Sequence, residues 1–119
     1  MKQTEIISGF VQLGKLMCAL GENKEWESFS IGVTKEEFDT LQVVINRQRS
    51  YNGWFTKENV RDSLFELGSN LTEEKLTSWV SAYSFSKSPK SVAIIMAGNI
   101  PLVGFHDFLC VLLSGNRAV

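Results

Sequence analysis

The stretch that decides the fold is SVAIIMAGNIP, residues 91–101. Its first six residues, 91–96, form a continuous apolar run rich in β-branched side chains, which is typical of a strand buried on both faces in a parallel sheet. Small and turn-forming residues follow in 97–101, and they predict a loop at the carboxyl end of the strand. We therefore expect a strand that passes through a loop into the next element.

The residues after this loop predict a βαβ unit. Residues 102–113 have a helical pattern, and from Phe108 onward the helix is apolar on every side, so it needs cover all round. Residues 114–116 end the helix, and 117–119 begin a second strand, which implies a right-handed crossover with parallel pairing. Because two strands leave bare edges, we expect the chain to be the N-terminal piece of a longer protein.

The residues before the strand predict four amphipathic helices, at 4–20, 34–49, 56–67 and 72–83. Thr34, Thr56 and Thr72 each fit a cap at the start of one of these helices. The polar segment 22–32 is expected to be an ordered loop. Its aromatic residues are Trp26 and Phe29. The inward-facing residues that the spacing predicts are Ile6, Phe10, Leu13, Met17, Leu20, Phe38, Leu41, Ile45, Val60, Leu64, Leu67, Trp79, Val80 and Tyr83.

Composition restricts the class of protein. With 119 residues the chain can build one core, and 44% hydrophobic with 21% charged residues is ordinary globular composition. A net charge of −1 argues against a nucleic-acid-binding face. No stretch reaches the roughly 18 apolar residues that a membrane span requires, and the N-terminus has no signal-peptide pattern. We therefore expect a cytoplasmic protein without a membrane span.

The two cysteines, Cys18 and Cys110, lie in apolar stretches. Neither belongs to a CxxC motif, and we see no histidine at ligand spacing and no activating base next to either thiol. Both are interpreted as buried structural thiols, which fits a reducing cytoplasm, and no metal site is predicted.

The candidate site is the loop after the 91–96 strand, because ligands bind at the carboxyl ends of parallel strands. Ala97 and Gly98 are small enough for a ligand to approach the backbone, Asn99 offers an amide donor, and Pro101 suits a helix start. The alternative is a plain turn with Pro101 as helix initiator. The loop is neither a GxGxxG motif nor a P-loop, so its spacing alone predicts no nucleotide.

His106 and Asp107 fall in the first turn of the predicted helix. Asp107 is explained by the helix dipole, which favours a negative charge at this end. His106 is the only histidine, and its place next to the loop makes it a candidate base or substrate-positioning group. The alternative is a structural histidine in an apolar helix.

Residues 88–119 closely resemble the start of the cofactor-binding domain in bacterial acyl-CoA reductases. These are long-chain fatty-acyl reductases related to the luciferase fatty-acid reductase and, more distantly, to the aldehyde dehydrogenase superfamily. The most specific part is MAGNIPLVGFHD, 96–107, and the segments NGWFT (52–56) and LTEE (71–74) also resemble that family's helical N-terminal region. The resemblance implies an α/β fold, mostly helical in this chain. A helical module, 1–84, is followed at 90–119 by the truncated start of a Rossmann-like, aldehyde dehydrogenase-type cofactor domain with its first βαβ.

In that superfamily the loop asparagine donates to the oxyanion formed when a cysteine attacks the acyl carbonyl. The resemblance gives this role to Asn99, with Pro101 two residues on, while Gly98 and Ile100 replace aromatic flanks and leave the pocket shape open. It further implies NADPH as cofactor, with Ala97, Gly98 and Pro101 as binding residues, and fatty acyl-CoA as substrate. The nucleophilic cysteine would lie outside this chain, which would be inactive alone.

Two further expectations concern partners. The all-apolar helix and the unpaired second strand predict a homo-oligomer. The alternative to a reductase is a non-enzymatic helical module that binds a partner protein and carries a small βαβ appendage.

Overall fold

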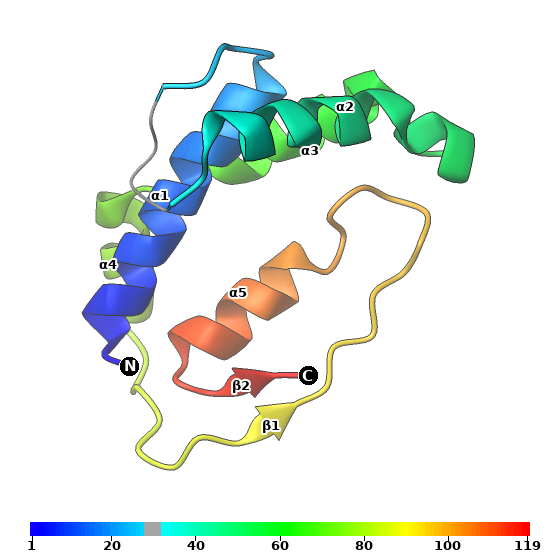
Figure 1. Ribbon diagram of the computed structural model, residues 1–119. Coiled ribbons are helices and arrows are strands. Elements are labelled where there is room, and N and C mark those ends of the chain that lie inside the picture. Colours follow the sequence, from blue (N-terminus) through cyan, green and yellow to red (C-terminus); the bar gives the residue numbers. More distant parts are fainter. Residues whose placement is uncertain (28–31) are drawn as a thin grey trace.

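The chain folds into a set of helices with a very small parallel sheet. The computed structural model describes residues 1–27 and 32–119, so Phe29 lies outside the described residues. Figure 1 shows how the elements are arranged. In the described residues they are α1 (Gln3–Gly21), α2 (Lys35–Tyr51), α3 (Lys57–Ser69), α4 (Glu73–Val80), β1 (Ser91–Val92), α5 (Phe105–Leu113) and β2 (Arg117–Ala118).

The predicted threonine caps are confirmed at the starts of α2, α3 and α4. Thr34 Oγ1 accepts the Glu37 amide at 3.1 Å, and Glu37 Oε2 accepts the Thr34 amide at 2.9 Å, which completes a capping box. Thr56 accepts the Asn59 amide at 3.1 Å, and Thr72 accepts the Lys75 amide at 3.3 Å. Each hydroxyl satisfies an amide that has no partner inside its own helix.

Thr34→Ala should lower the free energy of unfolding by about 1 kcal/mol, because the α2 capping box loses its hydroxyl. Urea denaturation measures the change. The matched control is Thr40→Ala, since Thr40 lies within α2 and its hydroxyl bonds the Glu36 carbonyl of the preceding turn. The control should be neutral or slightly stabilising, because alanine is the better helix former. Equal losses in both variants would contradict a specific cap.

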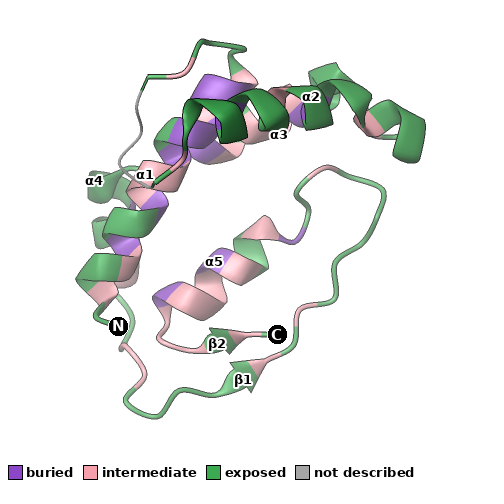
Figure 2. Ribbon diagram, in the orientation of Figure 1, coloured by how far each residue is buried: buried purple, intermediate pink, exposed green. Residues whose placement is uncertain are grey.

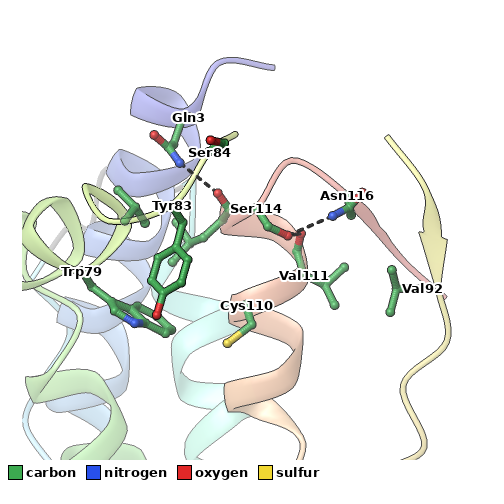
Figure 3. Close-up of a pocket in the computed structure, with 11 residues that line it drawn as sticks. Gln3, Trp79, Tyr83, Ser84, Val92, Cys110, Val111, Ser114 and Asn116 are labelled. Carbon is green, nitrogen blue, oxygen red and sulfur yellow. Dashed lines mark hydrogen bonds between the residues drawn. The ribbon is translucent and has the colours of Figure 1, made fainter. Parts of the chain in front are cut away.

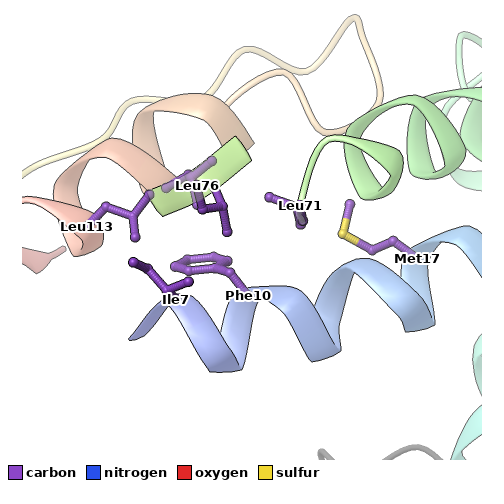
Figure 4. Close-up of a cluster of buried hydrophobic side chains, with 7 residues drawn as sticks. Ile7, Phe10, Met17, Leu71, Leu76 and Leu113 are labelled. Atoms are coloured by element: carbon purple, nitrogen blue, oxygen red, sulfur yellow. The ribbon is translucent and has the colours of Figure 1, made fainter. Parts of the chain in front are cut away.

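Helix α1 is the element on which the other helices pack. Residues 7–17 of α1 join α4, α5 and the residue run before α4 in one apolar cluster, made of Ile7, Phe10, Met17, Leu71, Leu76, Leu109 and Leu113 (Figure 4). Its C-terminal half joins α2 and α3 in a second cluster, made of Leu16, Ala19, Leu20, Phe38, Ile45 and Val60. Figure 2 shows buried residues along α1, between these neighbours. The helical module therefore shares a core with α5; that 90–119 begins a separate cofactor domain stays a prediction.

Two glycines let α1 and α3 approach closely. A Cβ atom on Gly14 would lie 2.7 Å from Leu71 Cβ and 2.9 Å from the Gly68 carbonyl oxygen. A Cβ atom on Gly68 would lie 2.8 Å from the Gly14 carbonyl oxygen. These separations are shorter than van der Waals contact, so any side chain at either position would force the two helices apart.

Arg61 ties three helices together. Its guanidinium donates to the Leu20 carbonyl at the end of α1, to Gln42 Oε1 at 2.8 Å and to Asn46 Oδ1 at 3.1 Å. Partial burial lowers the pKa of Arg61. A cation at the C-terminal end of α1 also complements the helix dipole.

Three of the inward-facing predictions are wrong. Leu41 is 37% exposed, and the buried residues of α2 are Phe38 and Ile45. Helix α2 packs on one side only, so its buried stripe is one side chain wide and Leu41 falls beside it. Trp79 is 36% exposed, and Leu76 is the buried residue of α4. Tyr83 is also exposed, because α4 ends at Val80, three residues earlier than the predicted end.

The predicted parallel pairing is confirmed, but the strand is much shorter than 91–96. Ser91 pairs with Arg117 and Val92 with Ala118, in parallel. The last ladder bond runs from the Ile94 amide to the Val119 carbonyl at 2.9 Å. Ser91 is exposed and Val92 is half-buried, and Ile95, beyond the paired residues, is 97% exposed. The prediction of burial on both faces is therefore wrong for this strand.

Helix α5 begins at Phe105 and not at the predicted residue 102. Leu102 has φ +59°, in the left-handed region, so the chain makes a turn over 101–104 before it becomes helical. The predicted cover on all sides is also wrong, because only Leu109 and Leu113 of α5 are buried. The other apolar residues of α5 are half-buried, and Phe105, Phe108 and Leu112 pack against the first cluster.

Candidate functional site

The candidate site lies on the long loop between β1 and α5. In Figure 1 this loop rises from the sheet toward the C-terminal end of α2. There Asn52 Nδ2 donates to the Gly98 carbonyl at 2.7 Å, while Asn52 Oδ1 accepts the Trp54 amide at 3.0 Å. The side chain of Asn52 therefore holds the loop against the end of α2. Sequence reasoning missed this role, because Asn52 reads locally as a helix-ending turn residue.

Asn99 lies next to this anchor and is exposed. Its side-chain amide makes no hydrogen bond with any described residue. Ala97 and Gly98 are exposed too, and a Cβ atom added at Gly98 would meet nothing within 4 Å. The loop therefore presents a free amide donor beside open backbone, as an oxyanion donor requires.

Pro101 and Gly104 shape the approach to α5. Pro101 is half-buried and opens the 101–104 turn, so it lies before α5 and not in its first turn. Gly104 is buried because the Met96 side chain lies directly against it, which closes the loop on itself. No side chain caps α5 at Gly104, and Asp107 supplies a negative charge in its first turn.

His106 is exposed in the first turn of α5. Its ring contacts Trp79 and Cys110, and not the loop. Its ring stacks on Trp79, with centroids 5.6 Å apart and planes at 22°. It lines a cavity of about 340 Å³ between α3, α4 and α5, and Asn99 is not among the lining residues. The structure therefore does not bring His106 and Asn99 into one pocket.

The interpretation of Cys110 needs two corrections. His106 Nε2 lies 3.6 Å from Cys110 Sγ, so a base does stand next to this thiol. The two residues are four positions apart and therefore share one face of the helix, which is the spacing that sequence reasoning overlooked. The second correction is that Cys110 is half-buried, where full burial was predicted. Cys18 is half-buried as well.

The pKa of each thiol is raised. Burial raises the pKa of Cys110, and the Asp107 carboxylate raises it further. Burial also raises the pKa of Cys18, with a further contribution from Glu22. Neither environment produces the thiolate that a nucleophilic cysteine needs.

A larger cavity lies between the end of α4, α5 and β1 (Figure 3). Its volume is about 530 Å³, and it is partly open to solvent. Cys110 lies in its wall, and Trp79 and Tyr83 lie on its α4 side. The sequence predicted no cavity here, because its walls come from three separate segments.

Residues 1–27 and 32–119 contain no group of three or more His, Cys, Asp or Glu side chains that could hold a metal ion. None of the helices in these ranges is both long and apolar enough to cross a membrane.

Comparison with known proteins identifies no family. No protein-family model, no curated protein and no solved structure matches this chain.

Proposed function

We propose that this chain is the N-terminal part of an NADPH-dependent acyl-CoA reductase that converts fatty acyl-CoA to fatty aldehyde. The observation that carries the proposal is the free side-chain amide of Asn99. It stands in the loop between β1 and α5, within the MAGNIPLVGFHD segment that resembles the reductases. A donor that no protein group uses is available for an oxyanion.

The chemistry begins with attack by a cysteine from outside this chain on the acyl thioester. The carbon–sulfur bond to CoA breaks, the acyl group becomes a thioester of the enzyme, and coenzyme A leaves as a thiol. Negative charge develops on the carbonyl oxygen during the attack, and the Asn99 amide stabilises it. Asn52 acts as a positioning residue, because its bond to the Gly98 carbonyl places the loop.

The residues around Asn99 leave room for a nicotinamide nucleotide to approach the backbone. Ala97 and Gly98 leave the backbone open to close approach, and Pro101 turns the chain away after them. NADPH supplies the hydride that releases the acyl group as an aldehyde. In this proposal the exposed outer surface of the sheet and of α5 is covered by the remainder of a Rossmann-like, aldehyde dehydrogenase-type domain.

The purified 119-residue chain should oxidise no NADPH with any fatty acyl-CoA, because the pKa of each of its two thiols is raised and the proposed nucleophile lies elsewhere. The longer protein that contains it should reduce a fatty acyl-CoA to the aldehyde. NADPH absorbance and trapping of the aldehyde measure both reactions. Turnover by the short chain, or none by the longer protein with acyl-CoAs of several lengths, would contradict the proposal.

A second candidate function is a helical module that binds a partner protein or a second copy. It is favoured by the exposed apolar side chains on and near the β1–α5 loop, which are Ile95, Met96, Ile100, Leu102 and Val103. The reading frame discriminates between the two candidates. A cofactor domain encoded after Val119 supports the reductase, and a natural stop codon at this point supports the binding module.

A further inference from the structure

The outer face of α2 is left bare by the described part of the fold. On the inner side of this helix Phe38 and Ile45 lie in the second cluster, and Arg61 of α3 binds Gln42 and Asn46. Figure 2 shows exposed residues along most of α2. The exposed residues that line up opposite the buried side, which we call the α2 seam, are Glu36, Thr40, Val43 and Arg47.

The spacing of the α2 seam is that of a helix that pairs with another helix. Positions 36, 40, 43 and 47 follow one another in steps of four, three and four residues, as the contact positions of a coiled coil do. Val43 is 46% exposed at the middle of the seam. The Thr40 hydroxyl already donates to the Glu36 carbonyl at 2.9 Å, so a neighbouring helix would leave it satisfied. The centre of the seam can therefore be covered.

The two ends of the α2 seam carry opposite charges. Glu36 lies in the first turn of α2 and Arg47 lies near the other end of the helix. Neither belongs to an ion pair within residues 1–27 and 32–119, where the ion pairs join Lys24 to Glu22 and Lys35 to Asp39. A seam with one acidic and one basic end complements an identical seam that runs in the opposite direction, whereas a parallel copy would place like charges together.

We propose that two copies of this chain associate through the α2 seam, with the two helices antiparallel. Glu36 then lies opposite Arg47 of the second copy, and Thr40 lies opposite Val43 of the second copy. The two-fold axis repeats both pairs, which gives four consecutive layers of contact. This surface is separate from α5 and from the β1–α5 loop, and the proposed reductase function leaves it unassigned.

The dimer should be weak. Helix α2 has 17 residues, which corresponds to a length of about 25 Å. One pair of such helices buries less than the roughly 1,600 Å² that is usual for a stable interface, so we expect a dissociation constant of about 100 μM or more. Sedimentation equilibrium of the 119-residue chain over a range of concentrations measures it. Added salt should weaken the association, because the outer layers are ion pairs at the surface.

Exchange of the two charges tests the pairing. Glu36→Arg alone and Arg47→Glu alone should each raise the dissociation constant by about tenfold or more, because each turns two attractive layers into two repulsive ones. The protein that carries both substitutions should return to within about threefold of the original value, since every charged layer is again a pair of opposite charges. A folding defect in either single variant cannot explain this recovery, because the double variant contains both changes.

The matched controls reverse charges outside the α2 seam. Glu58→Arg corresponds to Glu36→Arg, because each glutamate is exposed and lies two residues after the threonine that caps its helix. Arg49→Glu corresponds to Arg47→Glu, because Arg49 is an exposed residue of the same helix that does not belong to the seam. Both controls should leave the dissociation constant unchanged, which separates the seam from the effect of net charge.

Cross-linking tests the direction of the helices. In a background of Cys18→Ser and Cys110→Ser, chains with Thr40→Cys are mixed with chains that carry Val43→Cys. Disulfides should form faster between unlike chains than between like ones, because only the antiparallel arrangement places position 40 directly opposite position 43.

Three outcomes would overturn the inference. The first is a chain that stays monomeric up to millimolar concentration. The second is a dimer that is insensitive to both charge reversals, which would place the interface on α5 or on the β1–α5 loop. The third is faster cross-linking between like chains than between unlike ones.

Discussion

In the reductase that we propose, Asn99→Ala should slow acyl transfer from acyl-CoA to the enzyme by about 100-fold or more. The amide is free in the structure, and its bond to the carbonyl oxygen matters most when negative charge develops there. The fold should be unaffected, because no described residue depends on this side chain. Single-turnover acylation measured beside thermal unfolding separates the two effects.

Two other substitutions at the same position distinguish a catalytic role from a turn. Asn99→Asp should be at least as damaging as alanine, because it places a negative charge against the developing oxyanion. If Asn99 is only a turn residue, Asn99→Gly should be almost silent and Asn99→Ala should cost mainly stability. Near-normal acylation by a well-folded Asn99→Ala protein would rule out the catalytic role, and NADPH binding should be nearly unchanged in all three variants.

Gly14→Leu should destabilise the protein by about 3 kcal/mol or more, which is the upper range for overpacking a core. A Cβ at this position already lies 2.7 Å from Leu71 Cβ and 2.9 Å from the backbone oxygen of Gly68. A leucine can be accommodated only if α1 and α3 separate, which also exposes Met17 and Leu71 of the first cluster. Urea denaturation followed by circular dichroism measures the loss.

The matched control is Gly9→Leu, five residues earlier in the same helix. A Cβ on Gly9 would meet nothing within 4 Å. This variant should be neutral or gain up to about 0.8 kcal/mol, because leucine is a better helix former than glycine. Comparable destabilisation by both substitutions would show that backbone conformation, and not the close approach of α1 and α3, requires glycine at position 14.

The sequence predicted much of the candidate loop but not its surroundings. The apolar run and the small residues after it predicted Asn99 directly after a strand that ends at 96, whereas β1 ends at Val92 and Asn99 lies further along the loop with its side chain exposed. Asn52, whose side chain holds the loop by its bond to the Gly98 carbonyl, is 46 residues from Gly98 in the chain. His106 was a candidate base or positioning group next to the loop, with a structural histidine as the alternative, and in the structure its ring stacks on Trp79 of α4. Contacts between distant segments leave no local pattern in the sequence.

The sequence by itself determined where α2, α3 and α4 begin and that the two strands pair in parallel. Thr34, Thr56 and Thr72 bond amides within three residues, so their caps depend on local geometry alone. The tertiary structure alone decided that Gly14 and Gly68 are the contact between α1 and α3, that Arg61 joins three helices, and that β1 stops after two residues. Helix starts are local, whereas packing distances and the length of a strand depend on which other segments lie beside it.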